Sequence, residues 1–366
     1  MVHRPFERSL FVLAACILLA GGLTSLAATA QAAGLPRKTD VFPRLGSTAD
    51  SVFTPAGPGL VLDGGELEVT AAFAAWMRST LSPDSTSRLG DVVVLTAEAN
   101  SGLDSDIYKA APFNSVQTIS LPPPSTQADL EQAASVIDKA ESVFFDGGNQ
   151  HNYTQWAGSP LMAAVQRVYQ RGGVVGGSSA GLAILGQYAF DSSNGRIDSA
   201  EALADPYSSR VTFTRNMLKF PPLAGWITDS HFGARDRFGR LTVFMERQIA
   251  DGAVSGAHPQ VYGLGIDETA AVVVDRAGRA KVLQSPSNPG AAYFVVGGPA
   301  AQVSAGKPLV YPNLEVARLD APGQYYAMTR RCGTGPKYTI SVDARQADPF
   351  GGVNPYSAPG VAASCP

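Results

Sequence analysis

The chain has 366 residues, of which 45% are hydrophobic and 16% are charged, a balance typical of a globular protein with one large domain or two smaller ones. This hydrophobic content excludes disorder throughout the chain. The formal net charge is −3 and no run of lysines or arginines occurs, so the sequence lacks the basic surface that nucleic-acid binding requires.

Residues 1–32 have the features of a secretory signal peptide. A basic start is followed by an apolar centre over residues 10–20 and by Ala30-Gln31-Ala32, a small-residue cleavage site. The apolar centre is shorter than the ~20 residues that a membrane-spanning helix needs. We therefore expect a secreted protein, extracellular or periplasmic, with no membrane association once the signal is removed. Lipidation at Cys16, which ends a lipoprotein-like box, is the alternative.

Removal of the signal would leave two cysteines, Cys332 and Cys365. An even pair in an exported chain indicates one disulfide, which would stabilise the fold by roughly 3 to 4 kcal/mol in the chain-entropy model; two free thiols are the alternative. These cysteines and the three remaining histidines show no metal-ligand spacing, so we expect neither a metal nor another cofactor.

Apolar strand patterns alternate with helix patterns over residues 58–275. In chain order, the expected elements are a strand at 59–65, a helix at 66–81, strands at 91–97 and 116–121, a helix at 127–140, a strand at 142–148, a helix at 161–170, strands beginning at 174 and 225, a helix at 240–250, and strands at 262–267 and 270–274. Residues 190–222 are polar and loop-like. This alternation predicts a mostly parallel α/β sheet with helical crossovers.

The pattern changes after residue 275. Short strands separated by glycine, proline and asparagine are expected at 280–282, 292–296 and 338–342. We therefore expect four parts, which are the signal at 1–32, an irregular lead-in at 33–57, a catalytic α/β domain at 58–275 and a β-rich C-terminal extension at 276–366.

Residues 172–185 are predicted to form a strand, a tight turn and the start of a helix. The centre of this stretch, Gly177-Ser178-Ser179-Ala180-Gly181, matches the pattern G-x-S-x-G. In such a turn the serine hydroxyl projects from the backbone, and free N–H groups of the helix start face the charge that forms during attack on a carbonyl. We interpret Ser179 as a nucleophile. Turns of this composition also bind phosphate or cap helices, and the pentapeptide alone does not exclude these roles.

A nucleophilic serine needs a base, because its hydroxyl is a weak nucleophile until a neighbour takes the proton. His231 follows a short apolar strand at its carboxyl end, where α/β sheets place catalytic groups, so we expect it to be the base; a buried structural histidine is the alternative. His151 could line the pocket, and His258 is expected at the surface. The short separation between Ser179 and His231 argues against an α/β-hydrolase, which inserts further strands there.

Four motifs occur in the order seen in cyanophycinases: FFDGGNQ at 144–150, GGSSAG at 176–181, DSHF at 229–232 with three arginines after it, and GIDETA at 265–270. Over residues 58–275 the chain resembles this serine peptidase family, which also contains aspartyl dipeptidase, and its export signal makes it most similar to the secreted members. The resemblance implies a flavodoxin-like α/β fold, related to class I glutamine amidotransferases, with a Ser-His-acid triad. Cyanophycinases hydrolyse cyanophycin, a poly-aspartate whose side chains carry amide-linked arginine, to β-Asp-Arg dipeptides.

The resemblance implies roles by motif position. Ser179 would be the nucleophile and His231 the base, and the backbone N–H groups of Gly148 and Ala180 would form the oxyanion hole. The positions that resemble substrate contacts are Gln150, Asp229, Arg235, Arg237 and Arg240. An arginine can pair bidentately with a carboxylate, although a solvated helix face with local ion pairs is the alternative for this series.

The acid of the triad lies between the nucleophile and the histidine in this family, and the intervening loop is longer here. We expect Glu201 to be this acid, because its short apolar flank could hold it near His231. Asp198 and Asp191 are the alternatives.

The sequence therefore predicts an exported serine exopeptidase that degrades cyanophycin, or a β-Asp-Arg peptide, through an acyl-enzyme. The substrate arginine needs acidic partners, for which Asp104, Asp146 and Asp267 are available. The nearest alternative is the same machinery acting on aspartyl or isoaspartyl dipeptides. An inactive binding protein is the alternative from another class. The oligomeric state stays open, a homodimer included.

Overall fold

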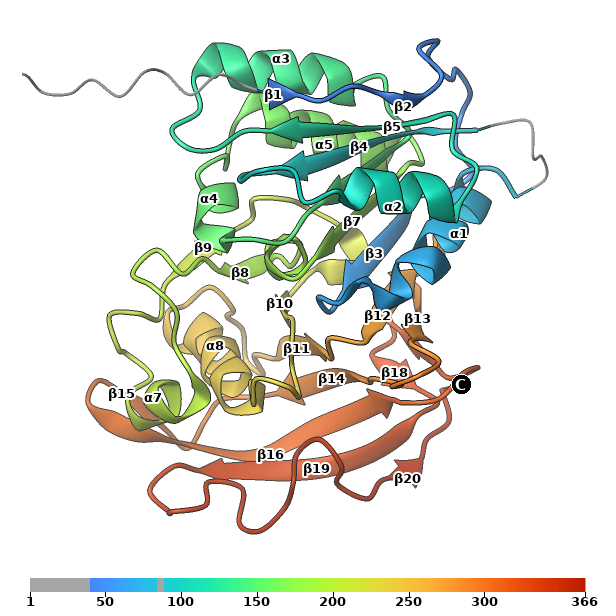
Figure 1. The fold of residues 1–366 in the computed structure, drawn as a ribbon. Helices are drawn as coiled ribbons and strands as arrows, with labels where there is room; N and C mark the ends of the chain where they lie inside the picture. The colour runs from blue at the N-terminus through green and yellow to red at the C-terminus, as the bar shows by residue number, and fades with distance from the viewer. Residues whose placement is uncertain (1–39, 84–88, 366) are drawn as a thin grey trace, which may run out of the picture. The chain divides into compact units, whose positions relative to one another are not determined.

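The computed structural model describes residues 40–83 and 89–365, which contain two β-sheets with helices packed against them (Figure 1). The described residues all belong to one compact unit. The expected signal peptide lies outside the described residues. Within the two described ranges, no helix has the length and apolar character needed to cross a membrane.

The first sheet has a parallel centre with antiparallel flanks. The parallel strands lie side by side in the order β5 (Ser115–Ser120), β4 (Asp91–Thr96), β6 (Ser142–Phe145), β7 (Val174–Ser178) and β3 (Gly59–Asp63). The antiparallel strands are β1 (Asp40–Val41) and β2 (Leu45–Gly46) on β5, then β12 (Ala270–Val274), β13 (Arg279–Gln284), β17 (Tyr325–Ala327) and β18 (Cys332–Gly333) beyond β3. The expected parallel sheet is therefore present at the centre, where apolar strands are buried on both faces.

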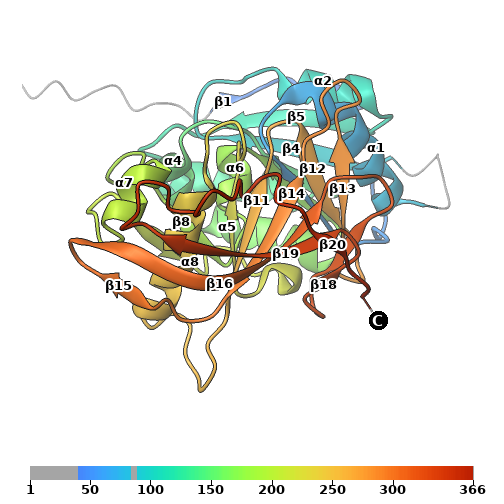
Figure 2. The same ribbon diagram turned by 90° about the horizontal axis from the view of Figure 1, so that it is seen from below.

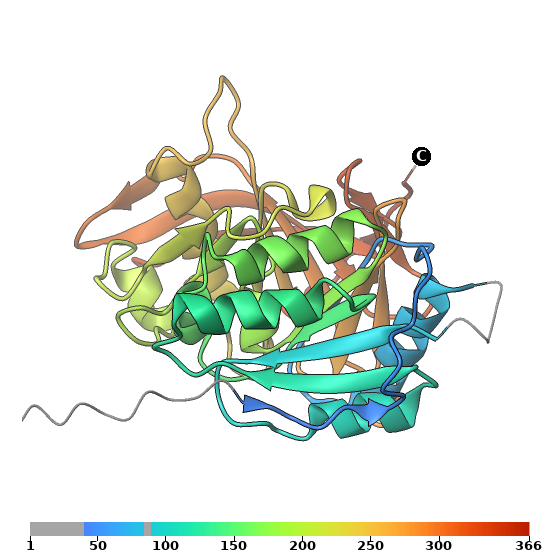
Figure 3. The ribbon, with the colours of Figure 1, turned by 90° about the horizontal axis from the view of Figure 1, so that it is seen from above.

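Helices cover both faces of this parallel centre. Leu60 and Leu62 of β3 face the apolar cluster that contains α3 (Gln127–Ile137) and α5 (Pro160–Gln170), and Figure 3 shows these two helices as a green pair. Val61 faces the opposite cluster, formed with α1 (Thr70–Leu81) and α2 (Leu103–Ala110). The alternation follows from the two-residue period of a strand. Helix α2 was not predicted from the sequence, and the helix predicted at 66–81 begins one residue before the short 3₁₀ turn Leu67–Val69 that precedes α1.

The second sheet joins strands from the middle and from the end of the chain. Its main order is β20 (Val361–Ala362), β19 (Pro336–Asp343), β16 (Lys307–Leu319), β14 (Ala292–Gly297), β11 (Val261–Ile266), β10 (Trp226–Asp229), β8 (Tyr188–Phe190) and β9 (Phe213–Arg215), and β15 (Gln302–Ser304) pairs with β16. Figure 2 shows β14, β16 and β19 side by side. The helix α8 (Phe238–Ala250) packs against β10 and β11.

The strands after residue 275 extend both sheets. Strand β13 continues the first sheet from β12, and β14 continues the second sheet from β11. The β-rich C-terminal region therefore completes both sheets. The region 190–222, expected as a loop, contains α7 (Ser199–Ala204), β9 and the short 3₁₀ turn Pro221–Leu223, and the lead-in contributes β1 and β2.

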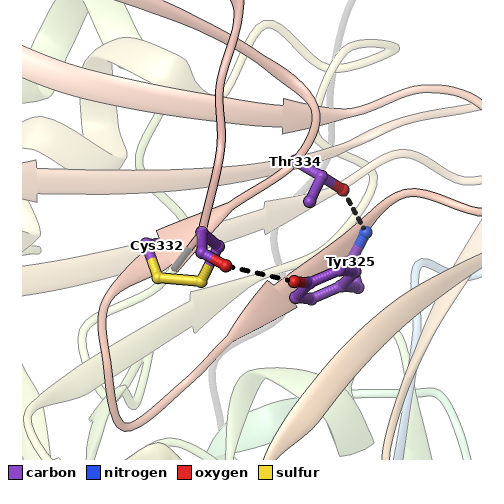
Figure 4. Close-up of a disulfide and its surroundings, with 4 residues drawn as sticks. Tyr325, Cys332 and Thr334 are labelled. Carbon is purple, nitrogen blue, oxygen red and sulfur yellow. Dashed lines mark hydrogen bonds between the residues drawn. A yellow bond between two sulfur atoms is a disulfide. The ribbon is translucent and has the colours of Figure 1, made fainter.

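The two cysteines that remain after the expected signal form a disulfide. Cys332 and Cys365 are bonded across 33 positions, as expected from their even number, and the bond ties the end of the chain to β18 (Figure 4). The hydroxyl of Tyr325 donates to the carbonyl oxygen of Cys365 at 3.4 Å, which adds a second link to the same segment.

Candidate active site

Ser179 lies in the turn between β7 and the short helix α6 (Ala180–Ala183). Its backbone has a φ of 52° and a ψ of −109°, a conformation that strains a residue other than glycine and recurs at functional turns. The N–H of Ser179 donates to the carbonyl oxygen of Asp63, at the end of β3, at 3.1 Å. The turn is thereby fastened to the neighbouring parallel strand.

The two glycines of the G-x-S-x-G pattern are needed because strand and helix pack closely around this turn. A Cβ atom on Gly177 would lie 2.5 Å from the carbonyl group of Gly181. A Cβ atom on Gly181 would lie 2.3 Å from the carbonyl oxygen of Phe145 in β6. Any larger residue at either position would push α6 off the sheet and move Ser179 with it.

His231 lies in the turn after β10, and its ring reaches Ser179. The Oγ atom of Ser179 and the Nε2 atom of His231 are 2.7 Å apart. The backbone of His231 is left-handed, with a φ of 47°, and its N–H donates to the carbonyl oxygen of Gly64 at 2.9 Å. The residue is 6% exposed, and its ring packs so closely on Gly65 that a Cβ there would lie 2.3 Å from Cε1. The structure thus brings the predicted nucleophile and base together.

Glu268 occupies the position beside the other ring nitrogen of His231. Its Oε1 atom lies 2.5 Å from Nδ1, in the turn between β11 and β12. Strands β10 and β11 are parallel neighbours, so their carboxyl ends deliver His231 and Glu268 to the same place. When Nδ1–H donates to this carboxylate, Nε2 carries no hydrogen and can accept the proton of the Ser179 hydroxyl.

The environment of His231 favours its neutral form. Burial lowers the pKa of His231 below its ordinary value of 6.5, and the positive charge of Arg235 lowers it further, whereas the hydrogen bond to Glu268 raises it. The net shift is downward. The imidazole is therefore held in the form that accepts a proton.

The acid predicted from the sequence, Glu201, does not contact His231. Glu201 lies in α7, and its carboxylate forms an ion pair with Arg210 at 2.9 Å. The Glu201 side chain is 39% exposed. Asp198 caps the start of α7 by accepting the N–H of Glu201, and Asp191 accepts hydrogen bonds from two threonine hydroxyls. The acids of this loop serve its own local structure, so the expectation that one of them would adjoin the histidine is wrong.

Glu268 was not singled out in the sequence, although it stands within the motif GIDETA. A signal for it existed, because it lies two positions after the end of an apolar strand, as His231 does. What the sequence does not state is that these two strands are neighbours in the sheet.

The turn at residues 147–149, after β6, lies beside the nucleophile. A Cβ atom on Gly147 would be 3.7 Å from the Cβ of Ser179. Glu98 fastens this turn by accepting the N–H of Asn149 at 2.7 Å. The N–H of Gly148 donates to no other described residue, and Ala180 begins α6, so its N–H has no acceptor within that helix. Both N–H groups predicted for the oxyanion hole are therefore available as donors.

The other two histidines and Gln150 take no part in the hydrogen bond between Ser179 and His231. His258 is exposed, as expected, and His151 is half-buried in α4 (Gln150–Thr154) without a hydrogen bond to Ser179. The side-chain amide of Gln150 donates to the carbonyl oxygen of Phe190 at 2.8 Å, so part of its donor capacity is already used.

Asp229 and Arg240, predicted as substrate contacts, form a buried ion pair with each other. The Nε and Nη2 atoms of Arg240 donate to the two carboxylate oxygens of Asp229 at 2.7 and 2.6 Å, and the residues are 4% and 2% exposed. Burial by itself would raise the pKa of Asp229, but Arg240 and Arg237 outweigh it and lower the pKa. The pair links α8 to the end of β10, two residues before His231. The charges of these two side chains are therefore paired with each other, and the pair helps to position the site.

An arginine-rich cavity of about 360 Å³ adjoins the triad. Its lining residues are Arg196, Ile197, Asp198, Glu201, Arg210, Arg235, Arg237 and Arg240. The side chain of Arg235 is 53% exposed, and its Nε lies 3.5 Å from Oε1 of Glu268. Burial lowers the pKa of Arg237 to about 10, and its Nη1 donates to the carbonyl oxygen of Ser230 at 2.9 Å. An anionic group, such as a carboxylate, is the chemical partner of such a cavity.

Negative charge gathers near the Gly148 turn instead. A second cavity, of about 700 Å³, is lined by Glu98 and Asp40 among mostly uncharged residues. Asp146, which precedes this turn, accepts a hydrogen bond from Ser101 at 2.5 Å, and burial raises its pKa. The nucleophile thus lies between surroundings of opposite charge.

The three acids considered for a substrate arginine have different environments. Asp104 is 6% exposed and bonds locally to Asn100, and Asp146 lies at the turn just described. Asp267 accepts the N–H groups of Gly233 and Ala291 at 2.9 Å each, so it braces the His231 turn.

A further buried carboxyl group lies beneath the nucleophile. Asp63 is 2% exposed, and its Oδ1 atom has no hydrogen-bond partner among the described residues. Burial raises the pKa of Asp63 to about 8, although the hydroxyl of Ser178 opposes this shift. Burial therefore favours the neutral form of Asp63. The described residues contain no group of three or more histidine, cysteine or acidic side chains arranged to hold a metal ion.

Comparisons with known proteins relate part of the chain to one enzyme class. No family model matches the chain. A cyanophycinase from Trichormus variabilis is 30% identical over 161 residues, which are 43% of this chain and 47% of that protein. A cyanophycinase from Synechococcus elongatus is 28% identical over 158 residues, 43% of each chain. The matched segment thus spans about half the length of these curated relatives, or less.

Two solved structures resemble the fold more distantly. A peptidase from an acI-B1 actinobacterium covers 75% of this chain and 97% of its own, with 16% identity and a TM-score of 0.44. A putative peptidase E from Listeria monocytogenes covers 63% and 99%, with 13% identity and a TM-score of 0.38. Over less than half of its length, the chain is therefore a distant sequence relative of curated cyanophycinases.

Proposed function

We propose that the chain is an exported serine exopeptidase that hydrolyses cyanophycin to β-Asp-Arg dipeptides through an acyl-enzyme. The observation that carries this proposal is the hydrogen-bonded series of Ser179, His231 and Glu268, with distances of 2.7 and 2.5 Å. Export rests on the signal-like pattern of residues 1–32.

The geometry supports the usual order of proton transfers. Oγ of Ser179 attacks the carbonyl carbon of the scissile amide, and its proton passes to Nε2 of His231. Glu268 stabilises the imidazolium that forms and holds the ring in the required tautomer. The N–H groups of Gly148 and Ala180 stabilise the oxyanion, where one lost donor costs roughly 3 to 4 kcal/mol.

The second half of the reaction uses the same groups in reverse. The imidazolium gives its proton to the leaving amine, which departs and leaves an ester on Ser179. His231 then takes a proton from water, whose oxygen attacks the ester carbonyl. Collapse of that intermediate returns the proton to Ser179 and releases a carboxylic acid.

The charges around the nucleophile support a substrate that carries both signs. Cyanophycin presents carboxylate at its free chain end and a guanidinium on each arginine. Arg235 and its cavity suit a carboxylate, and Glu98 with Asp146, near the Gly148 turn, suits a guanidinium. The sequence match to cyanophycinases supports the same substrate.

The test is incubation of the purified protein with insoluble cyanophycin, with the released products identified by mass spectrometry. Clearing with release of β-Asp-Arg is expected. Cleavage of aspartyl or isoaspartyl dipeptides alone would indicate the dipeptidase alternative, and binding without products would indicate an inactive binding protein.

A pair of serine variants links the activity to the site. Ser179→Ala should abolish turnover while the protein stays folded, whereas Ser178→Ala, which removes the adjacent hydroxyl, should keep it. Full activity of Ser179→Ala would rule out the proposed nucleophile.

A further inference from the structure

A small cavity lies beside the disulfide, at the end of β10 opposite to His231. Its volume is about 80 Å³, and it is enclosed by strands of both sheets and by the last residues of the chain. The lining residues are Phe294, Val296, Glu315, Ala317, Tyr326, Arg331, Cys332, Gly333, Lys337, Ala363 and Ser364. A water molecule takes about 30 Å³ of the liquid, so the cavity has room for one small ion or about two waters.

Two lining residues bring buried hydrogen-bond donors that no described residue satisfies. Tyr326 is 1% exposed, and its hydroxyl has no partner. The Nη1 atom of Arg331 is buried and likewise lacks a partner, while its Nη2 donates to the carbonyl oxygen of Ala224 at 2.9 Å. Buried polar groups in folded proteins nearly always have a hydrogen-bond partner. The Tyr326 hydroxyl and the Nη1 atom of Arg331 therefore both lack an expected acceptor.

A third donor lies in the same cluster. The Nε1 atom of Trp226, the first residue of β10, is buried and has no partner among the described residues. The Trp226 ring meets the Tyr326 ring edge to face at 5.8 Å, and the guanidinium of Arg331 lies 5.1 Å from its centroid. Indole and guanidinium groups donate hydrogen bonds and accept none, so the cluster is short of acceptors.

The charge of Arg331 is not balanced by an acid. Arg331 forms no ion pair with a described residue, and its guanidinium is sandwiched against Tyr262, 3.8 Å from the ring centroid. The two other charged lining residues, Glu315 and Lys337, pair with each other at 2.7 Å. The cavity therefore keeps the net positive charge of one half-buried guanidinium, whose Nη1 atom is buried and attracts an anion.

We propose that this cavity, lined by Tyr326 and Arg331, binds one small monovalent inorganic anion of the halide class. The anion accepts hydrogen bonds from both side chains and neutralises the guanidinium. It lies where β17 and β18 of the first sheet meet β14 and β16 of the second, next to the disulfide-bonded chain end, so it stabilises the junction of the two sheets. The proposal does not depend on the catalytic assignment.

Thermal unfolding of the full disulfide-bonded chain tests the site with sodium bromide as the probe. Bromide is titrated against sodium gluconate at constant ionic strength, because gluconate is too large for the cavity. The expected result is a saturable rise of Tm with bromide alone, as mass action requires for a ligand of the folded state. No bromide-specific rise would overturn the proposal.

Three variants locate the effect. Arg331→Gln should remove the saturable rise, and Tyr326→Phe, which deletes one hydroxyl, should raise the apparent Kd for bromide roughly tenfold or more, as loss of a hydrogen bond to a charged group does. Arg345→Gln is the matched control, because Arg345 is an exposed arginine that pairs with Asp343 and lies outside the cavity. An unchanged bromide response in Arg331→Gln would contradict the proposed site.

A crystal grown in bromide gives a direct readout that is independent of variant stability. An anomalous peak within hydrogen-bond distance of Tyr326 Oη and Arg331 Nη1 is expected. Density for water alone in a bromide-soaked crystal would refute the proposal.

Discussion

Glu268 accepts a hydrogen bond from His231 at 2.5 Å although 37 positions separate the two residues in the chain. They meet because β10 and β11 run parallel as neighbours and both end at the same edge of the sheet. An acid in this position holds the imidazole in one tautomer and stabilises its charged form.

Glu268→Gln is therefore expected to lower kcat by about 10²- to 10⁴-fold while the fold is kept, since a comparable acid-to-amide change in a serine protease costs about 10⁴-fold. The matched control is Glu201→Gln, which changes the acid predicted from the sequence. Steady-state kinetics on cyanophycin should show little loss of kcat for this control, and because Glu201 lines the arginine-rich cavity, any loss is expected in KM. If Glu201→Gln lost activity and Glu268→Gln kept it, the acid would be misassigned.

The pH dependence of activity should reflect the ionisation of His231. Burial and then Arg235 lower the pKa of this histidine, so the acidic limb of kcat/KM is expected below pH 6.5. Arg235→Gln removes one of these causes and should move the limb to higher pH. Arg210→Gln, which changes an arginine paired with Glu201, should leave the limb in place. A limb that moved to lower pH in Arg235→Gln would contradict the electrostatic argument.

The buried carboxyl group of Asp63 should make stability depend on pH. Folding raises its pKa from 3.8 to about 8, so between these values the folded chain holds a proton that the unfolded chain has released. The contribution is complete below the lower value and is lost as pH rises toward the upper one, by at most about 1.4 kcal/mol per pH unit.

Asp63→Asn keeps the shape of the neutral acid and cannot ionise, so its free energy of unfolding should fall less steeply over this range. Urea unfolding at several pH values measures both proteins. Burial also raises the pKa values of Glu141 and Glu246 to about 7, and these two residues add the same pH dependence to the parent and to the variant. The difference between the two pH profiles therefore reports Asp63 alone. Parallel pH profiles for variant and parent would show that Asp63 is ionised in the folded chain.

The ion pair of Arg240 with Asp229 should matter far more for stability than the exposed pair of Arg210 with Glu201. Arg240→Gln leaves a buried carboxylate with only the N–H of Ser230 and the longer contact to Arg237, and it should cost about 3 to 5 kcal/mol. Arg210→Gln should cost about 0 to 1 kcal/mol, because water and ions screen that pair. Chemical denaturation of both variants measures these changes in the free energy of unfolding. Equal losses of stability in the two variants would contradict the structural role of the buried pair.

Strand positions near the nucleophile were predictable from the sequence because burial leaves a local signature. The run Asp91–Thr96 is almost wholly apolar, as a strand covered on both faces must be, and β4 lies there. The same reasoning placed Ser179 and His231 after strands, since each follows a short apolar run. These predictions depended only on residues next to one another in the chain.

Other features depend on which strands become neighbours, and the sequence does not state that. The partnership of His231 with Glu268 follows from the order of β10 and β11, whereas Glu201 was favoured by its place between Ser179 and His231 in the chain and by its short apolar flank. Strand β16 was missed because its alternation is interrupted near Asn313, where the register with β19 shifts and the backbone has a φ of 58°.

Strands β13 and β14 limit how far this protein can be truncated from its C-terminal side. A gene that stops after residue 275 would leave β12 and β11 as bare edges, with rows of unpaired backbone groups open to other chains. Such a truncated protein should aggregate during expression even though it contains every residue of the proposed triad. Protein engineering on this scaffold should therefore retain the tail through Cys365 and place fusions outside it.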